Sequence, residues 1–342
     1  MLQGHQPARE FFRRTIQAGR LASTYLFVGP EGIGKRTFAH WLAKALQCSG
    51  SDSNGLEACG RCESCLLCDA GSHPDVLTVA RPPGKSSLPL DLFIGRAEHR
   101  HREGLCHDIA LKPYLGRRRV AIIDDADALG VESANCLLKT LEEPPPHSVL
   151  ILIGTSLARQ LPTIRSRAQV VRFAPLDPTT AAQVLESLPE WTAGAPSEGR
   201  PDAETLARLA RGSVSRALAL SDGSAEEDRR AVLGCLERSV GDPLRLAKLL
   251  QERTDSAGKQ ASERRDRLRR LIGFLVESGR EAMHAAAAAG TDPSGALSMV
   301  EACLDAEEAI DRNANLANVV ARLAQQLAAA APRAVAARGQ AV

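Results

Sequence analysis

A glycine-rich loop between an apolar strand and a helix constrains the fold of this chain more than any other feature. Residues 25–28 are apolar, residues 36–46 are typical of a helix, and Gly29-Pro30-Glu31-Gly32-Ile33-Gly34-Lys35 lies between them. A G-x-x-x-x-G-K loop in this context binds nucleotide phosphates, because its glycines let backbone N–H groups turn inward and its lysine reaches the outer phosphates. The alternative is a structural turn, but the lysine at this offset favours a phosphate loop. The nucleotide-binding candidates are Gly29, Gly32, Gly34 and Lys35.

Further apolar segments predict the sheet that this loop belongs to. They are residues 76–79, 120–123, 149–153 and 170–173. Each has four or five residues bounded by turn or charged residues, which is the pattern of buried parallel strands. With helices between them, they predict an α/β domain with a mainly parallel sheet.

The strand-like segments end after this domain and helix-forming sequence follows, so we divide the chain into domains. The first domain spans 1–174 and contains a cysteine-rich module at 48–68. A small helical domain follows at 175–222. After it comes a helix-forming domain at 225–332, in which Asp242-Pro243 is typical of a helix start. The last residues, 333–342, lack periodicity and are treated as a tail.

Two departures weaken the catalytic part of the predicted nucleotide site. The position that usually supplies a Ser or Thr hydroxyl to Mg²⁺ is Arg36, and Thr37 follows one place late. A guanidinium cannot ligate a cation.

The second departure lies at the end of the strand at 120–123, which is followed by Asp124 and Asp125. At these positions the first carboxylate usually positions Mg²⁺ and the second orients the attacking water. Asp125 is shorter than the expected Glu. Asp124, Asp125 and Asp127 could instead cap the next helix. We therefore expect ATP or ADP binding with weak or absent hydrolysis, and the pattern argues against Mg²⁺.

Nine cysteines are the unusual part of the composition. The N-terminus lacks a basic segment followed by an apolar core, and the apolar runs are too short to span a bilayer, so we expect a cytoplasmic protein without a disulfide framework. Four thiolates within 18 residues can close a tetrahedral structural zinc site, with free thiols as the alternative. The candidate ligands are Cys48, Cys59, Cys62 and Cys65. Cys68 is an alternative fourth ligand.

The charge balance limits unaided contact with nucleic acid. The chain has 43 Lys and Arg against 41 Asp and Glu, a formal net charge of +2, and 3% aromatic residues. This composition argues against a strongly basic surface and against base-stacking platforms. The basic and His-rich segment 81–119 is the exception. It is either a solvated helix and loop or a surface that contacts DNA phosphates without sequence preference.

Several motifs occur in an order that resembles a known family. They are Gly4-His5-Gln6, the phosphate loop, the cysteine module, His73-Pro74-Asp75, the segment 120–127 and Leu137-Leu138-Lys139-Thr140-Leu141-Glu142-Glu143-Pro144-Pro145. Together they resemble the AAA+ subunits of bacterial DNA polymerase III clamp loaders, most closely the delta-prime type. The similarity is strong over residues 1–220, and Asn313-Ala314-Asn315-Leu316 adds a weaker likeness in the helical domain.

The resemblance implies roles for three further residues. Ser166-Arg167-Ala168 matches the family's Ser-Arg-Cys motif apart from the alanine, so Arg167 corresponds to an arginine finger that reaches a neighbouring subunit's nucleotide. Without the resemblance, a surface salt bridge would be the preferred interpretation. Thr155 resembles the sensor-1 position, with a simple strand-end hydroxyl as the alternative. Arg216 resembles sensor 2 in the lid domain.

The resemblance also implies a function and partners. The chain would be a delta-prime-like subunit that supports ATP-dependent loading of a sliding clamp onto primed DNA. Its partners would be the other subunits of a hetero-pentamer-like ring, the clamp and, through the complex, primer–template DNA, with no membrane. Residues 225–332 would form the collar. The chain would belong to a DNA-directed DNA polymerase holoenzyme, a nucleotidyltransferase by association, in the cytoplasm near the nucleoid. The alternatives are a gamma/tau-like motor subunit and another AAA+ DNA-remodelling ATPase.

Overall fold

The predicted apolar segments form one parallel sheet. The strands are β1 (Thr24–Val28), β2 (Val76–Val79), β3 (Arg119–Ile123), β4 (Ser148–Gly154) and β5 (Gln169–Arg172). In the computed structural model their order is β2-β3-β4-β1-β5, and every neighbouring pair is parallel. β1, β3 and β4 are buried along their whole length, as expected for central strands covered on both faces. The predicted α/β class with a parallel sheet is confirmed.

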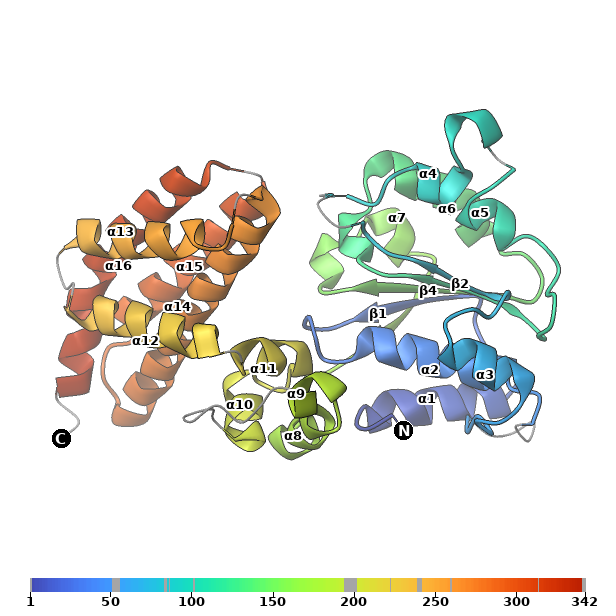
Figure 1. Cartoon of the computed structure of the whole chain (residues 1–342), viewed down its shortest axis with the longest axis horizontal. Coiled ribbons are helices and arrows are strands. Elements are labelled where there is room, and N and C mark those ends of the chain that lie inside the picture. The colour runs from blue at the N-terminus through green and yellow to red at the C-terminus, as the bar shows by residue number, and fades with distance from the viewer. Residues whose placement is uncertain are drawn as a thin grey trace. The chain divides into compact units, whose positions relative to one another are not determined.

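The structure describes most of the chain. The described residues are 2–50, 56–82, 85, 87–100, 102–193, 202–221, 223–238, 242–258, 260–312 and 314–339. They belong to two compact units, residues 1–220 and 221–342 (Figure 1). Parts of the predicted segments, including Pro83, Gly84, His101 and Asn313, lie outside the described residues.

Helices cover both faces of the sheet in the first unit (Figure 1). One face packs against α1 (Gln6–Gln17) and α2 (Lys35–Gln47), with α3 (Glu63–Asp69) beside α2. The other faces α4 (Asp91–Ile94), α5 (Leu105–Asp108), α6 (Val131–Glu142) and α7 (Pro162–Arg165). Successive strand residues alternate between these two cores. Phe27 packs with Phe12 and Phe38, whereas its neighbour Leu26 packs with Phe93 and Leu137.

Short helices follow β5 in the described part of the first unit. They are α8 (Pro178–Glu186), α9 (Pro189–Ala193), α10 (Ala203–Leu209) and α11 (Val214–Leu220). The turn before α11 approaches the start of this segment closely, since Leu176 donates its backbone N–H to the Gly212 carbonyl at 3.3 Å. Gly212 has φ +72°, and a Cβ there would lie 1.9 Å from the Leu176 oxygen, so this contact requires glycine.

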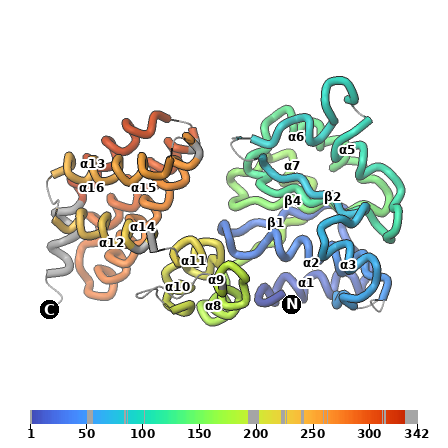
Figure 2. Tube along the Cα trace, in the orientation of Figure 1, coloured from blue at the N-terminus to red at the C-terminus, as the bar shows by residue number. Residues whose placement is uncertain are grey.

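The second unit is helical. Its helices are α12 (Gly223–Arg238), α13 (Pro243–Asp255), α14 (Ala261–Ala289), α15 (Ser294–Asp311) and α16 (Leu316–Gly339). They pack as a bundle (Figure 2). α16 extends into the segment 333–342 that the sequence analysis sets aside as a tail. Among the described helices of both units, none combines the length and the apolar character needed to cross a membrane.

A fully buried carboxylate fixes the loop that leads into β3. Asp75 is 0% exposed and accepts backbone N–H bonds from Tyr114 at 2.6 Å, Leu115 at 2.8 Å and Gly116 at 2.7 Å. Arg119 Nε lies 3.7 Å away. Burial alone raises the pKa of Asp75, but the three N–H donors and Arg119 outweigh it and leave the pKa below its ordinary value.

We predict that Asp75→Asn destabilises the protein by about 3 kcal/mol or more, because an amide cannot accept all three bonds and leaves Arg119 without its anion. Since the folded pKa is lowered, this stability is present above the ordinary pKa of 3.8 and is lost as the pH falls through the lower folded value. Urea unfolding at neutral and acidic pH measures it. Asp69→Asn is the control, because Asp69 is 56% exposed in a surface pair with Lys44. Equal stability losses for the two variants would contradict the assignment.

Candidate functional site

The glycine-rich loop lies at the carboxyl edge of the sheet. It joins β1 to α2, and Val28 at the end of β1 pairs with Gly154 at the end of β4. Gly32 and Gly34 have φ of +73° and +99°, a backbone conformation that lets N–H groups turn inward. Lys35 is 6% exposed, and its Nζ donates to the Gly29 carbonyl at 2.6 Å and to the Pro30 carbonyl at 2.5 Å. The four predicted phosphate-binding residues therefore lie in one loop, with the lysine folded over it.

The loop is supported by His5, which sequence reasoning did not identify as a site residue. His5 Nε2 lies 2.7 Å from the Ile33 carbonyl, so it donates a hydrogen bond to the centre of the loop. Its ring packs edge-on against Phe173, with centroids 5.0 Å apart. Burial lowers the pKa of His5, the bond to Ile33 opposes this, and Lys35 lowers it further. The available signal was Gly4-His5-Gln6, which the family resemblance included without assigning a role.

The two acidic residues after β3 lie beside the loop and are paired with arginines. Arg36 Nη1 lies 3.5 Å from Asp124 Oδ2. Arg81 Nε lies 3.2 Å from Asp125 Oδ2. Burial raises the pKa of Asp124, while its bond from the Asp125 N–H and the charges of Arg36 and Lys35 oppose the rise. The carboxylates predicted to serve Mg²⁺ and water thus face guanidinium groups, and Arg36 occupies the position of the usual hydroxyl ligand. These residues do not fit a magnesium ion at that position.

Thr155 and Asp127 form a second polar cluster at the same edge. The Thr155 backbone N–H and hydroxyl both donate to Asp127 Oδ2, at 2.7 and 2.5 Å. The Gln160 side chain donates to the other oxygen of Asp127. Sequence reasoning considered Asp127 only as a helix cap and did not connect it with Thr155. The structure joins the proposed sensor threonine to a carboxylate 28 positions earlier.

The start of α11 contacts the phosphate loop. Ser213 donates its hydroxyl to the Glu31 carbonyl at 3.0 Å, and the Ser215 N–H donates to the Gly32 carbonyl at 3.3 Å. A Cβ on Gly32 would lie 2.5 Å from the Ser213 hydroxyl, which again requires glycine. Arg216 follows in the first turn of this helix and is half-buried. The structure therefore brings the helix of the predicted sensor-2 residue to the loop, whereas Thr37 is exposed on α2.

Arg167 lies just after α7 and is anchored at the surface. Its Nη2 donates to Glu142 Oε1 at 2.7 Å, and its Nη1 donates to the Thr163 carbonyl at 3.1 Å and to the Ser166 hydroxyl at 3.0 Å. Its side chain is 34% exposed. The contacts align the guanidinium while leaving part of it accessible to a second molecule. Glu142 belongs to the Leu137–Pro145 run, and sequence reasoning gave it no role at the site.

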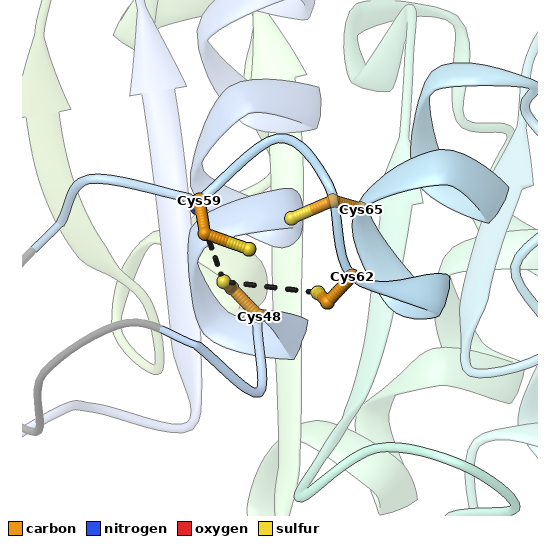
Figure 3. Close-up of side chains that lie close together, drawn as sticks. All are labelled: Cys48, Cys59, Cys62 and Cys65. Carbon is orange, nitrogen blue, oxygen red and sulfur yellow. Dashed lines mark hydrogen bonds between the residues drawn. The ribbon is translucent and has the colours of Figure 1, made fainter.

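The four predicted cysteines meet in one cluster, which Figure 3 shows. They come from the end of α2 and from α3 with the loop before it. Their Sγ atoms all lie within 4.8 Å of one another, and those of Cys48 and Cys62 are 3.9 Å apart. Sulfur atoms around a tetrahedral zinc are about 3.8 Å apart, given a Zn–S distance of about 2.3 Å. The donor set therefore fits a metal ion, and Cys68 lies outside it.

Some charged side chains of the basic segment 81–119 are paired with acidic residues of the chain itself. Arg81 pairs with Asp125, Arg119 lies 3.7 Å from Asp75, and His107 Nδ1 lies 3.0 Å from the Asp108 carboxylate. α4 and α5 pack onto the sheet through buried residues such as Phe93. These contacts support a structural role for part of the segment and leave its proposed DNA contact untested.

Comparisons with known proteins match this chain to subunits of DNA polymerase III. A family model described as "DNA polymerase III, delta subunit" matches residues 4–177. The DNA polymerase III subunit delta' of Pseudomonas aeruginosa is 38% identical over 214 residues, covering 62% of this chain and 60% of that protein. The subunit delta' of Escherichia coli is 30% identical over 69% of this chain and 65% of that protein. The subunit tau/gamma of Haemophilus influenzae is 32% identical, covering 66% of this chain and 31% of that protein. The matches thus span less than two thirds of each of these relatives.

Proposed function

Because the chain belongs to the DNA polymerase III delta subunit family, we propose that it is a delta-prime-type subunit of a bacterial clamp loader. It would support the ATP-dependent loading of a sliding clamp onto primed DNA without turning over ATP rapidly itself. Its partners would be the other subunits of a hetero-pentameric ring and the clamp, with primer–template DNA reached through the assembly. The protein would act in the cytoplasm, close to the chromosome.

One observation distinguishes this proposal from a motor subunit. Both carboxylates after β3 are paired with arginines, Asp124 with Arg36 and Asp125 with Arg81. A hydrolytic site needs these groups for the cation and for the attacking water. Their pairing supports a chain that contributes to a neighbour's catalysis. The contribution would come from Arg167, with Thr155 and Arg216 near its own nucleotide, and residues 225–332 would supply the collar.

The cysteine cluster would hold a structural zinc ion. Four thiolates fill a tetrahedral coordination shell and leave no position for a reactive water, so the ion would stabilise the fold around α3. ATP or ADP would bind in the glycine-rich loop, where Lys35 can turn from the loop carbonyls to the phosphates.

The competing assignment is a motor subunit, since the subunit tau/gamma of Haemophilus influenzae is 32% identical over 66% of this chain. We predict that the isolated chain hydrolyses ATP at a rate indistinguishable from background. When it is added to motor subunits, clamp and primed DNA, the ATPase rate should rise about tenfold or more, because a neighbouring site gains its arginine. Steady-state ATPase assays with and without the chain measure both quantities. Vigorous hydrolysis by the isolated chain would favour the motor assignment, and failure to bind the motor subunits would favour another AAA+ remodelling protein.

A further inference from the structure

The position of the usual magnesium ligand is taken by a positive charge. Arg36 directly follows Lys35 in the first turn of α2, and its guanidinium reaches Asp124, the carboxylate expected to face the cation. Thr37 does not replace the missing hydroxyl, because the next helical position is rotated by about 100° and its side chain is exposed. A divalent cation bound here would therefore meet a guanidinium where it needs an oxygen.

The second carboxylate is neutralised in the same way. Arg81 comes from the segment after β2, and it contacts Asp125 at 3.2 Å while its Nη1 donates to the Lys85 carbonyl. With Lys35, this edge of the sheet therefore carries three cationic side chains beside the carboxylates of Asp124, Asp125 and Asp127. Asp124 and Asp125 are thus each paired with a guanidinium of the chain itself.

Arg36 also has the geometry to take part in ligand binding. Its side chain is 58% exposed, and an exposed ion pair at 3.5 Å is weak, so the guanidinium can turn toward a ligand at little cost. A guanidinium has five N–H donors, which allows contact with a phosphate oxygen and with Asp124 at the same time. Arginine is suited to bidentate contact with phosphate.

We propose that Arg36 replaces the magnesium ion, so that this chain binds the phosphates of a nucleoside di- or triphosphate independently of divalent cations. The inference rests on the proposed nucleotide site but not on the clamp-loading role. A site of this kind retains nucleotide as a structural ligand and lacks the metal that activates water.

The test is a nucleotide titration of the isolated full chain, with ADP and ATP carrying a fluorescent group on the ribose. Metal-free buffer is obtained with a chelating resin before the protein is added, because a soluble chelator would also remove zinc from the cysteine cluster. We expect the wild-type dissociation constant to change less than about threefold when Mg²⁺ is added. Arg36→Thr restores the usual hydroxyl and should weaken metal-free binding by about tenfold or more, with recovery in Mg²⁺.

Two further variants complete the design. Arg36→Lys keeps the positive charge but lacks the planar guanidinium. In metal-free buffer its affinity for nucleotide should fall less than that of Arg36→Thr. Arg20→Thr removes an exposed arginine outside the site and should leave binding unchanged. A wild-type requirement for Mg²⁺, unchanged metal-free affinity of Arg36→Thr, or absence of nucleotide binding in both buffers would each overturn the proposal. The titration uses no partner subunit, so its failure is distinguishable from failure of the clamp-loading proposal, which the reconstituted ATPase assay reports.

Discussion

Arg167→Ala should abolish most of the ATPase activity of an assembled clamp loader that contains this chain, while the assembly itself stays intact. An arginine supplied to a neighbour's site stabilises charge on the transferring γ-phosphate and contributes about 10³–10⁵-fold to the rate at that site. We therefore expect a loss of about tenfold or more in the overall rate, with little change in the affinity between subunits.

The control for this prediction lies at the end of the short helix that precedes Arg167. Arg165 is an exposed arginine at the end of α7, two positions before Arg167. Arg165→Ala removes the same charge from the same surface, and it should change the ATPase rate less than twofold. Size-exclusion chromatography of both reconstituted variants checks the assembly. An unchanged rate for Arg167→Ala in an intact complex would exclude the arginine-finger assignment.

The contacts of Arg167 extend this argument to Glu142. An isolated surface arginine samples many rotamers, whereas this guanidinium is bound by Glu142 at 2.7 Å and by two further oxygen acceptors. Holding it in one orientation reduces the entropy lost when it engages a phosphate. The ion pair is partly exposed and weak in itself, so a γ-phosphate with greater negative charge can compete for the arginine. If Arg167 is the proposed arginine finger, Glu142 would hold its guanidinium in one orientation before a neighbour binds.

Much of the first unit could be predicted from sequence because its pattern is local. Buried parallel strands are short apolar runs, and each predicted run corresponds to a strand of the sheet. The loop and the cysteine spacing are also local, and the structure brings each set together. α4 and α5 have four residues each, too few for a helical period to be visible.

The polar pairs were harder to predict because they join distant segments. Arg81 and Asp125 are 44 residues apart, and Thr155 and Asp127 are 28 apart. Nothing near Arg81 distinguishes it from the other arginines of the basic segment. Their pairing follows from the order of the parallel strands, which brings the ends of β2, β3 and β4 to one edge. A motif identifies the residue types at a site, whereas the sheet topology decides which of them are paired.

The cysteine cluster gives the second large effect that we predict. The purified chain should contain one zinc ion, and Cys62→Ser or Cys65→Ser should lose it. Structural zinc contributes about 10–16 kcal/mol to the folding of small zinc peptides, although here only the segment around α3 depends on it directly. We expect a loss of about 3 kcal/mol or more in the stability of the first unit. Metal analysis of the purified variants and thermal unfolding measure the two effects.

Cys68→Ser is the matched control, and it also tests the alternative ligand. Cys68 belongs to the same helix as Cys65 but lies outside the cluster of four sulfur atoms. The Cys68→Ser variant should therefore retain its zinc and most of its stability. If Cys68→Ser lost its zinc while Cys48→Ser retained it, Cys68 would be the fourth ligand in place of Cys48.

Acidification should also release zinc from the wild type, because thiolate ligands must release their protons to bind metal. A metal-sensitive dye should report this release before the sheet unfolds. Zinc retained after loss of any one of the four clustered thiols would contradict a closed four-cysteine site, since a remaining shell of three would be open to water and to chelators.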